Sequence, residues 1–307
     1  MPDFDEFSFL SAQADDAGLA VTIPRGERLT LDLPDGRTLS GLRYGGPSPE
    51  VTFLHGAGLN AHTWDTTILA LGRPALALDL AGHGDSSWRE DAAYVPRMLA
   101  PDVVTAITAW TDRPQLLVGQ SLGGLTAAPV AAGAPAFVRR LAIVDITPGV
   151  DPTAGPSQVR AFFAGPTDWA SRDELVERAL SFGLGGGSRD KAARGVWLNS
   201  RVRSDGRVEW KHHFAHLAAA SSNDAGAAAS APNDALSALL SEAGWEDFAA
   251  VEAPILLIRA ERGYVTVADA EEFSRRLPAA EVTSVDSGHN VQEDAPVVLA
   301  GLLAGLL

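Results

Sequence analysis

The stretch Gly119-Gln120-Ser121-Leu122-Gly123 lies between an apolar run, 115–118, and a segment of mostly small residues, 125–132. The apolar run predicts a buried strand, and the second segment predicts a helix. A serine exposed at a sharp strand-to-helix turn has a strained backbone, and glycines two positions to either side leave room for that turn. In this context the pattern predicts that Ser121 is an exposed nucleophile.

Apolar strands and helical segments alternate on both sides of this turn. Strands are predicted at residues 28–33, 38–44, 51–54, 75–79, 115–120, 138–145, 254–258 and 281–285, with helices at 63–71, 99–110, 122–132 and 268–277 and a last helix after residue 290. This alternation indicates right-handed crossovers and a mainly parallel, doubly wound α/β sheet of about eight strands. The turn sequence Pro34-Asp35-Gly36-Arg37 joins the first two strands into a hairpin, which supplies an antiparallel edge.

The alternation stops after Thr147-Pro148-Gly149 and resumes about a hundred residues later. The intervening segment has helical stretches, a glycine-rich patch at 183–187 and most of the tryptophans. An insertion between two strands of a parallel sheet lies over the carboxyl ends of the strands, where such sheets bind ligands. We therefore expect a core domain of residues 1–148 and 251–307, and a helical cap of residues 149–250 inserted after the sixth strand.

The composition is that of a globular protein with a strongly acidic balance. Of 307 residues, 39 are Asp or Glu and 24 are Lys or Arg, which gives a formal net charge of −15. Such a charge repels phosphate backbones and anionic lipids, so neither nucleic acid nor a membrane is an expected partner. The expected partner is a small-molecule substrate, and the sequence leaves the choice between monomer and homodimer open.

Cysteine is absent, which excludes disulfides, thiolate catalysis and Cys-ligated metals. The first six residues are acidic and lack the cationic start and apolar core of a signal peptide, so a cytoplasmic location is expected. The apolar C-terminal stretch 299–307 is interpreted as part of a packing helix, because a membrane span needs about 20 apolar residues.

A serine nucleophile needs a base that takes its proton, and the base must be oriented by a third group. His289 is the best placed of the seven histidines, because it follows the last predicted strand on a loop before the final helix. Loops at the carboxyl ends of parallel strands converge, so Ser121 and His289 are predicted to meet. His55 and His83 lie in glycine-flanked loops and are interpreted as residues that tie backbone segments together.

Four short motifs surround these residues: His55-Gly56-Ala57-Gly58, Asp79-Leu80-Ala81-Gly82-His83-Gly84-Asp85-Ser86, Gly119-Gln120-Ser121-Leu122-Gly123-Gly124 and Gly288-His289. Together they resemble the α/β-hydrolase superfamily, in particular its capped, esterase- or lactonase-like serine hydrolases. The resemblance extends from about residue 28 to the end of the chain. It implies an oxyanion hole formed by the backbone N–H groups of Ala57 and Leu122, with Gly58 as a further candidate. A developing oxyanion needs two such fixed donors.

The acid behind His289 is open between two carboxylates. Many relatives carry an Asp after the strand predicted here at 254–258, but this chain has Gly263 at about that position. Asp145 ends the strand that follows the nucleophile helix, and neighbouring strand ends lie close enough for it to reach His289. Glu261 is the alternative acid, because its longer side chain could reach the same nitrogen from the next strand.

A third group of histidines lies in the cap. His212 and His216 are predicted to lie one turn apart on a helix, a spacing that can bind a metal. No carboxylate lies between them in the manner of His-Glu-x-x-His, and no further ligand is evident. Neither a metal nor a cofactor is therefore expected.

These features predict a serine hydrolase without a cofactor that cleaves a carboxylic ester or lactone through an acyl-enzyme. Its substrate is expected to be hydrophobic or aromatic and to contact four cap residues, Trp169, Trp197, Trp210 and Phe214. The same triad also serves C–C bond hydrolysis and acyl transfer, and proteins of this fold can bind ligands without turnover. These functions are the alternatives.

Overall fold

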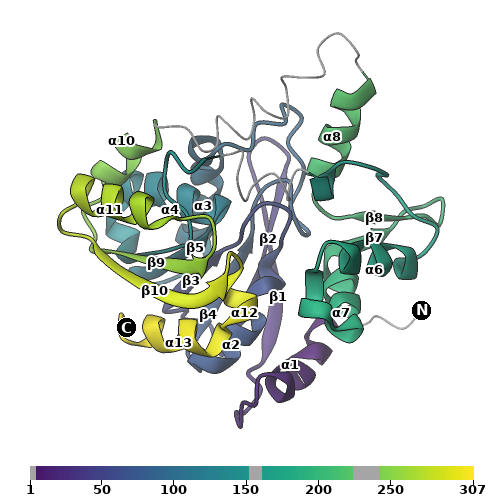
Figure 1. Cartoon of the computed structure of the whole chain (residues 1–307), viewed down its shortest axis with the longest axis horizontal. Coiled ribbons are helices and arrows are strands. Elements are labelled where there is room, and N and C mark those ends of the chain that lie inside the picture. The colour runs from purple at the N-terminus through teal and green to yellow at the C-terminus, as the bar shows by residue number, and fades with distance from the viewer. Residues whose placement is uncertain (1–4, 152–160, 224–242) are drawn as a thin grey trace.

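A computed structural model describes residues 5–151, 161–223 and 243–307 of the chain. Within these residues, one sheet of eight strands confirms the predicted α/β class (Figure 1). The strands lie in the order β1 (Gly26–Asp32), β2 (Thr38–Tyr44), β4 (Ala75–Asp79), β3 (Val51–Leu54), β5 (Gln115–Gln120), β6 (Val138–Val144), β9 (Ile255–Arg262) and β10 (Glu281–Gly288). β1 and β2 form the predicted hairpin, and β2 pairs antiparallel with β4. All pairs from β4 to β10 are parallel.

Helices cover both faces of this sheet, and each face has its own hydrophobic cluster. β3, β4 and β5 are buried along their whole length, which is why their sequences are continuous apolar runs without alternation. One layer contains α3 (Pro96–Trp110), α4 (Leu122–Gly133), α10 (Gly244–Ala249) and α11 (Val267–Arg276). The other contains α1 (Leu10–Asp16), α2 (Asp65–Leu71), α12 (Val291–Asp294) and α13 (Pro296–Ala304).

Helix α11 shows how a mostly polar segment is fixed onto this core. The Thr266 side chain accepts the N–H of Asp269, and the Asp269 side chain accepts the N–H of Thr266. This capping box satisfies donors that the first turn of a helix leaves unpaired. Phe273 is the buried residue of the helix and packs into the first cluster, so one aromatic side chain and one cap set its position.

Between β6 and β9, residues 161–223 form a separate body to the right of the sheet in Figure 1, which we call the cap. It contains α6 (Arg172–Ser181), η4 (Leu184–Gly187), α7 (Arg189–Asn199), β7 (Ser200–Val202), β8 (Val208–Trp210) and α8 (Phe214–Asn223). The antiparallel pair β7–β8 is an addition to the predicted helices. The cap has its own hydrophobic cluster, with Trp169 and Trp210 in edge-to-face contact.

The predicted cap segment, 149–250, includes residues 152–160 and 224–242, which lie outside the described residues. Helix α10 also falls within that segment, but its Trp245 and Phe248 belong to the hydrophobic cluster of the sheet, beside Phe273. By packing, α10 is therefore part of the core.

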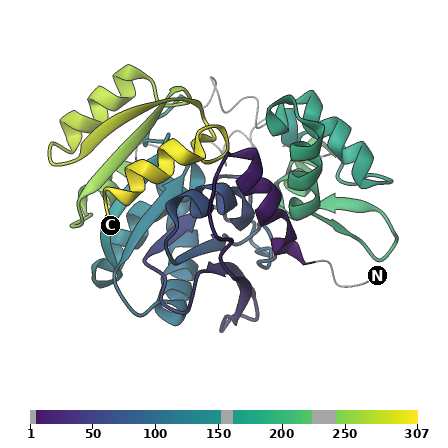
Figure 2. The same ribbon diagram turned by 90° about the horizontal axis from the view of Figure 1, so that it is seen from below.

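The N-terminal segment, formed by η1 (Glu6–Phe9) and α1, connects the core to the cap. Figure 2 shows α1 lying between the two. Leu10 and Ala14 are buried against the core, whereas Asp16 forms an ion pair with Arg194 of α7 at 2.8 Å. Phe9 contacts Trp197 of the same cap helix. The segment therefore fixes the cap relative to the sheet.

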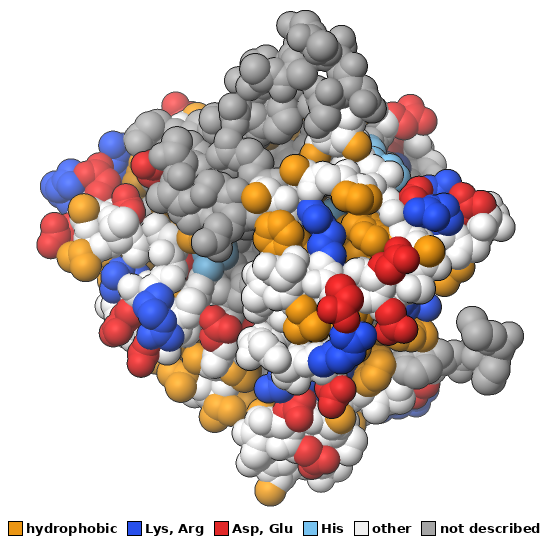
Figure 3. Space-filling model, turned by 45° about the vertical axis from the view of Figure 1, so that its right-hand side comes forward, with side chains coloured by type: hydrophobic (Ala, Val, Ile, Leu, Met, Phe, Trp, Pro, Cys, Tyr) orange, Lys and Arg blue, Asp and Glu red, His pale blue; other side chains and the backbone are white. Residues whose placement is uncertain are grey.

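The surface is mixed in charge, as Figure 3 shows for one face, where acidic and basic side chains are interspersed among hydrophobic ones. The larger exposed apolar side chains include Phe182 of the cap and Val297 and Val298 of α13. In the described ranges, every helix is too short or too polar to cross a membrane.

Candidate active site

Ser121 occupies the turn between β5 and α4 with a strained, positive-φ backbone, φ 53° and ψ −120°. The turn is tight enough to demand glycine on both sides. A Cβ on Gly119 would lie 2.3 Å from the carbonyl oxygen of Gly123, and one on Gly123 would lie 2.2 Å from that of Leu54. Both distances are far below a van der Waals contact, which explains the spacing of the pattern in physical terms.

Asp145 follows β6 directly and is fully buried, with φ 49°. Its Oδ1 accepts the backbone N–H of Ala260 at 2.9 Å, and its Oδ2 accepts that of Tyr264 at 2.7 Å. The same Oδ2 lies 2.8 Å from Nδ1 of His289. Backbone donors from β9 and the following loop therefore orient this carboxylate toward the imidazole.

Gly263 leaves the space that the Asp145 carboxylate occupies. A Cβ at position 263 would lie 2.0 Å from Oδ2 of Asp145. Glu261, the other candidate acid, is exposed near the end of β9, and no contact joins it to His289 among the described residues. Of the two carboxylates left open by the sequence, the structure brings Asp145 to His289 and leaves Glu261 in solvent.

The hydrogen bond to Asp145 engages Nδ1 of His289 and leaves Nε2 as the ring nitrogen available to another partner. A carboxylate only accepts, so in the neutral imidazole Nδ1 carries the proton and Nε2 keeps its lone pair. Ser121 and His289 line the same cleft. Among the described residues, no hydrogen bond joins the two side chains.

Tyr264 is a site residue that sequence reasoning missed. Its ring stacks on the imidazole of His289 with centroids 3.6 Å apart and planes 14° apart. Burial, together with the negative charge of Asp145, raises the pKa of Tyr264 to about 12, so its hydroxyl stays neutral. Its position next to Gly263, in the loop where an acid was expected, was the available signal.

The two predicted oxyanion donors, the N–H groups of Ala57 and Leu122, belong to residues that line the same cleft as Ser121. Leu122 is the first residue of α4, a position whose N–H has no acceptor within the helix. Ala57 lies in the loop after β3, and both residues line the cleft with Ser121. Gly58, the further candidate, has φ +77°, and a Cβ there would lie 2.5 Å from the ring of Phe163 in the cap.

The cleft has a volume of about 1010 Å³ and lies between the core, the cap and α1. Of the four cap residues expected to contact substrate, Trp210 lines it, together with Phe162 and Phe163. The expectation for the other three needs correction, because packing within the protein takes them elsewhere. Trp169 packs against Trp210 inside the cap, Trp197 lies under the guanidinium of Arg172, and Phe214 stacks behind Phe163.

The histidines outside the cleft have different environments. His55 accepts the N–H of Leu80 at Nε2, and its Nδ1 lies 2.8 Å from the carbonyl oxygen of Gly56, so it ties two loops together. His83 binds the carbonyl oxygen of Ala81 in the same way. His212 precedes α8, which begins at Phe214, so the prediction of His212 and His216 on one helical turn is wrong.

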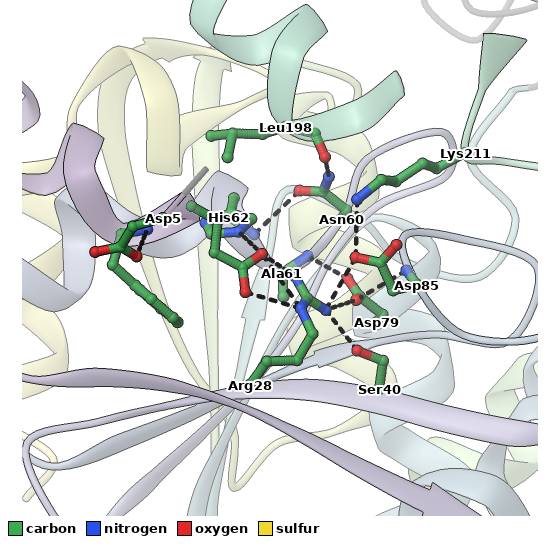
Figure 4. A network of polar contacts seen from close by, with 12 residues as sticks. Asp5, Arg28, Ser40, Asn60, Ala61, His62, Asp79, Asp85, Leu198 and Lys211 are labelled. Atoms are coloured by element: carbon green, nitrogen blue, oxygen red, sulfur yellow. Dashed lines mark hydrogen bonds and ion pairs between the residues drawn. The ribbon is translucent and has the colours of Figure 1, made fainter. Parts of the chain in front are cut away.

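A buried polar network supports the loop that carries Ala57 (Figure 4). Asp79, at the end of β4, accepts the N–H of Ala61 at 2.8 Å and pairs with Arg28 at 2.9 Å. The imidazole of His62 lies 3.0 Å from Asp65 and 3.1 Å from Glu6 of the N-terminal segment. Burial alone lowers the pKa of His62, but Asp65 and Glu6 raise it to about 9.

This raised pKa predicts a pH-dependent stability. A histidine whose pKa rises from 6.5 to about 9 on folding stabilises the protein fully below about pH 6.5 and loses that contribution as the pH rises through about 9. We expect the free energy of unfolding to fall by about 2–3 kcal/mol between about pH 6 and pH 9.5 in urea titrations. The His62→Gln variant should lack this fall, and an equal fall in both proteins would contradict the assignment to His62.

Proteins similar to this chain include enzymes of known structure. The esterase Rv0045c of Mycobacterium tuberculosis is 35% identical over 99% of this chain and 96% of its own length. A solved structure of that esterase has a TM-score of 0.79 at 33% identity and covers 99% of both chains. The mouse sn-1-specific diacylglycerol lipase ABHD11 is 30% identical over 55% of this chain and 57% of its own length.

A model of the alpha/beta hydrolase family matches residues 53–302, which include the turn of Ser121, Asp145 and His289. The sheet order, the turn after β5 and the full-length similarity to a solved esterase agree with that match. This chain belongs to the alpha/beta hydrolase family.

Proposed function

We propose that this protein is a serine hydrolase that cleaves a carboxylic ester or lactone. The observation that carries the proposal is the buried carboxylate of Asp145, which lies 2.8 Å from Nδ1 of His289, while His289 and Ser121 line the same cleft. The three residues follow three separate strands and occur along the chain in the order expected for nucleophile, acid and base. The esterase activity of a full-length relative supports the same assignment.

In the proposed reaction, Nε2 of His289 takes the proton of Ser121 as its Oγ attacks the carbonyl carbon. The N–H groups of Ala57 and Leu122 stabilise the oxyanion, each with about 3 kcal/mol of transition-state stabilisation. Protonated His289 then delivers its proton to the leaving alcohol, which leaves an acyl-enzyme. Water, deprotonated by the same imidazole, attacks the ester of Ser121 and releases the acid.

The cleft favours a substantial hydrophobic substrate. Its volume of about 1010 Å³ lies at the upper end of the usual range for small-molecule sites, about 300–1,000 Å³. Its lining includes Phe162, Phe163 and Trp210 of the cap and Ile146 of the core. Aromatic walls of this kind stabilise apolar acyl or alcohol groups through buried area.

A fluorophosphonate probe tests the proposal directly. We expect one covalent label per chain, located at Ser121 by peptide mass spectrometry, and no label on the Ser121→Ala variant. The Ser121→Ala variant should also lose hydrolysis of p-nitrophenyl esters by about 10⁶-fold in kcat, as loss of a serine nucleophile does in other hydrolases. A folded wild-type protein that takes no label would favour ligand binding without turnover.

The substrate class is tested with p-nitrophenyl esters of increasing acyl length beside a series of lactones. We expect kcat/KM to rise with acyl length until the chain fills the cleft. Activity confined to lactones would select the ring-opening reaction. A labelled protein that hydrolyses neither series would point to acyl transfer or C–C bond hydrolysis.

A further inference from the structure

Two asparagines join the cap directly to the loop that carries the oxyanion donor. Nδ2 of Asn199, the last residue of α7, donates to the carbonyl oxygen of Gly58 at 2.7 Å. In the opposite direction, Nδ2 of Asn60 donates to the carbonyl oxygen of Leu198 at 3.0 Å and approaches Oδ1 of Asn199 at 3.3 Å. The bonds are reciprocal, so we call Asn60 and Asn199 the amide clamp.

The orientation of the Asn60 amide is fixed by the core. Asn60 is the N-terminal capping residue of the 3₁₀ turn η2 (Ala61–Trp64), where its Oδ1 accepts the N–H of His62 at 3.0 Å. This leaves Nδ2 of Asn60 to donate to the carbonyl of Leu198. Figure 4 shows Asn60 between Leu198 on the cap side and the ion network on the core side. The next residue, Ala61, donates its N–H to Asp79, whose position is fixed by Arg28.

The loop Gly56–Asn60 is therefore held at three places: at its start, the Gly56 carbonyl accepts the N–H of Leu59 and lies 2.8 Å from Nδ1 of His55. Its C-terminal end is bound to the buried ion network of the core, and its middle is bound to the cap through the Gly58 carbonyl. Gly58 has a left-handed backbone, φ +77°, which glycine adopts without steric cost and which does not resist rotation of the adjacent peptides. The hydrogen bond from Asn199 supplies the restraint that the residue type itself does not.

We propose that Asn199 is a positioning residue for the oxyanion hole and that the seating of the cap thereby controls transition-state stabilisation. The inference rests on the proposed function, because Ala57, one residue before Gly58, is the proposed donor. An N–H donor stabilises the oxyanion strongly only when its position is fixed in advance. When the Asn199 side chain is present, its hydrogen bond to Gly58 keeps the Ala57 N–H aligned. When the Asn199 amide is removed, the Gly58 peptide can rotate and the Ala57 N–H loses its fixed position.

The test compares oxoesters with the matching thionoesters, in which sulfur replaces the carbonyl oxygen. Sulfur accepts hydrogen bonds weakly, so an oxyanion hole accelerates the oxoester more than the thionoester. We expect Asn199→Ala, and the isosteric Asn199→Asp that cannot donate to a carbonyl, to lower kcat for the oxoester by about tenfold. The thionoester should change less than about twofold, so the ratio of the two kcat values falls.

Lys211→Met is the matched control, because Lys211 forms another contact between cap and core, an ion pair with Asp85 at 2.8 Å, and does not line the cleft. This variant should leave the oxoester to thionoester ratio unchanged. Equal losses on both substrates in Asn199→Ala, or no loss on either, would overturn the role of Asn199 in a protein that is otherwise active. A wild-type protein that hydrolyses no oxoester and takes no fluorophosphonate label would instead overturn the proposed function.

Discussion

Replacing Asp145 with asparagine is expected to lower kcat for ester hydrolysis by about 10⁴-fold with little change in KM. The amide of asparagine either donates to His289 or offers a neutral oxygen. In the first case Nδ1 must accept, which moves the imidazole proton to Nε2 and removes the lone pair needed by Ser121. In the second case the imidazolium formed during attack loses its counter-charge. Steady-state kinetics on a p-nitrophenyl ester measures the loss.

Glu261→Gln is the matched control for this experiment. Glu261 is also a carboxylate at the end of a strand next to the site, but it is exposed. We expect kcat of Glu261→Gln to stay within about twofold of the wild-type value, since an exposed charge contributes little. Thermal unfolding shows whether Asp145→Asn keeps its fold, because Asp145 also accepts backbone N–H groups of Ala260 and Tyr264. A folded Asp145→Asn protein with near wild-type turnover, beside a strongly impaired Glu261→Gln, would reverse the assignment.

The second large effect is expected at Gly263, which contributes space and no side chain. The Cβ of Gly263→Ala would lie 2.0 Å from Oδ2 of Asp145, so the carboxylate must leave its bond to His289. We expect kcat to fall by about 10²-fold, since displacement of a catalytic group by about 1 Å costs about that much. Gly301→Ala is the control, because a Cβ at Gly301 meets nothing within 4 Å.

Because a Cβ at Gly263 would lie beside the Asp145 carboxylate, we expect that the acid can be moved from position 145, after β6, to position 263, after β9. In the double variant Asp145→Ala, Gly263→Asp, the space vacated by the first change receives a carboxylate from the second. We expect kcat at least about tenfold above that of Asp145→Ala alone, because an ionised partner for His289 is restored. The pair Asp145→Ala, Gly263→Asn provides the isosteric neutral control. Equal activity of the two double variants would mean that the recovered charge does not reach the imidazole.

The fold was predictable because its signals are local. β3, β4 and β5 are short, uninterrupted apolar runs separated by helices, and the turn sequence 34–37 marks the hairpin. Ser121 and His289 followed from the same kind of signal, since each lies where a strand ends. The carboxyl ends of parallel strands lie at the same edge of a sheet, so the nearness of Ser121 and His289 could be predicted without knowledge of side-chain packing.

The acid and the substrate contacts depend on tertiary detail, and the sequence left them open or misassigned them. Whether Asp145 or Glu261 approaches His289 is decided by the course of the loop 260–265, which turns its backbone N–H groups toward Asp145. An aromatic residue in a cap either lines the cleft, as Trp210 does, or fills the interior, as Trp169 does, and their sequence environments do not distinguish them. Tyr264 was missed because its position next to Gly263 marks the loop of the expected acid but does not reveal that its ring stacks on His289.

Ser121 and Asp145 are two of three non-glycine residues with positive φ in the ranges that the structure describes. A positive-φ backbone costs a side-chain-bearing residue of order 1 kcal/mol or more, and glycine avoids that cost. At Ser121, backbone strain therefore favours glycine, whereas the proposed role as nucleophile requires serine. A relative with glycine at the position of Ser121 is therefore expected to keep the fold and to lack the proposed hydrolysis.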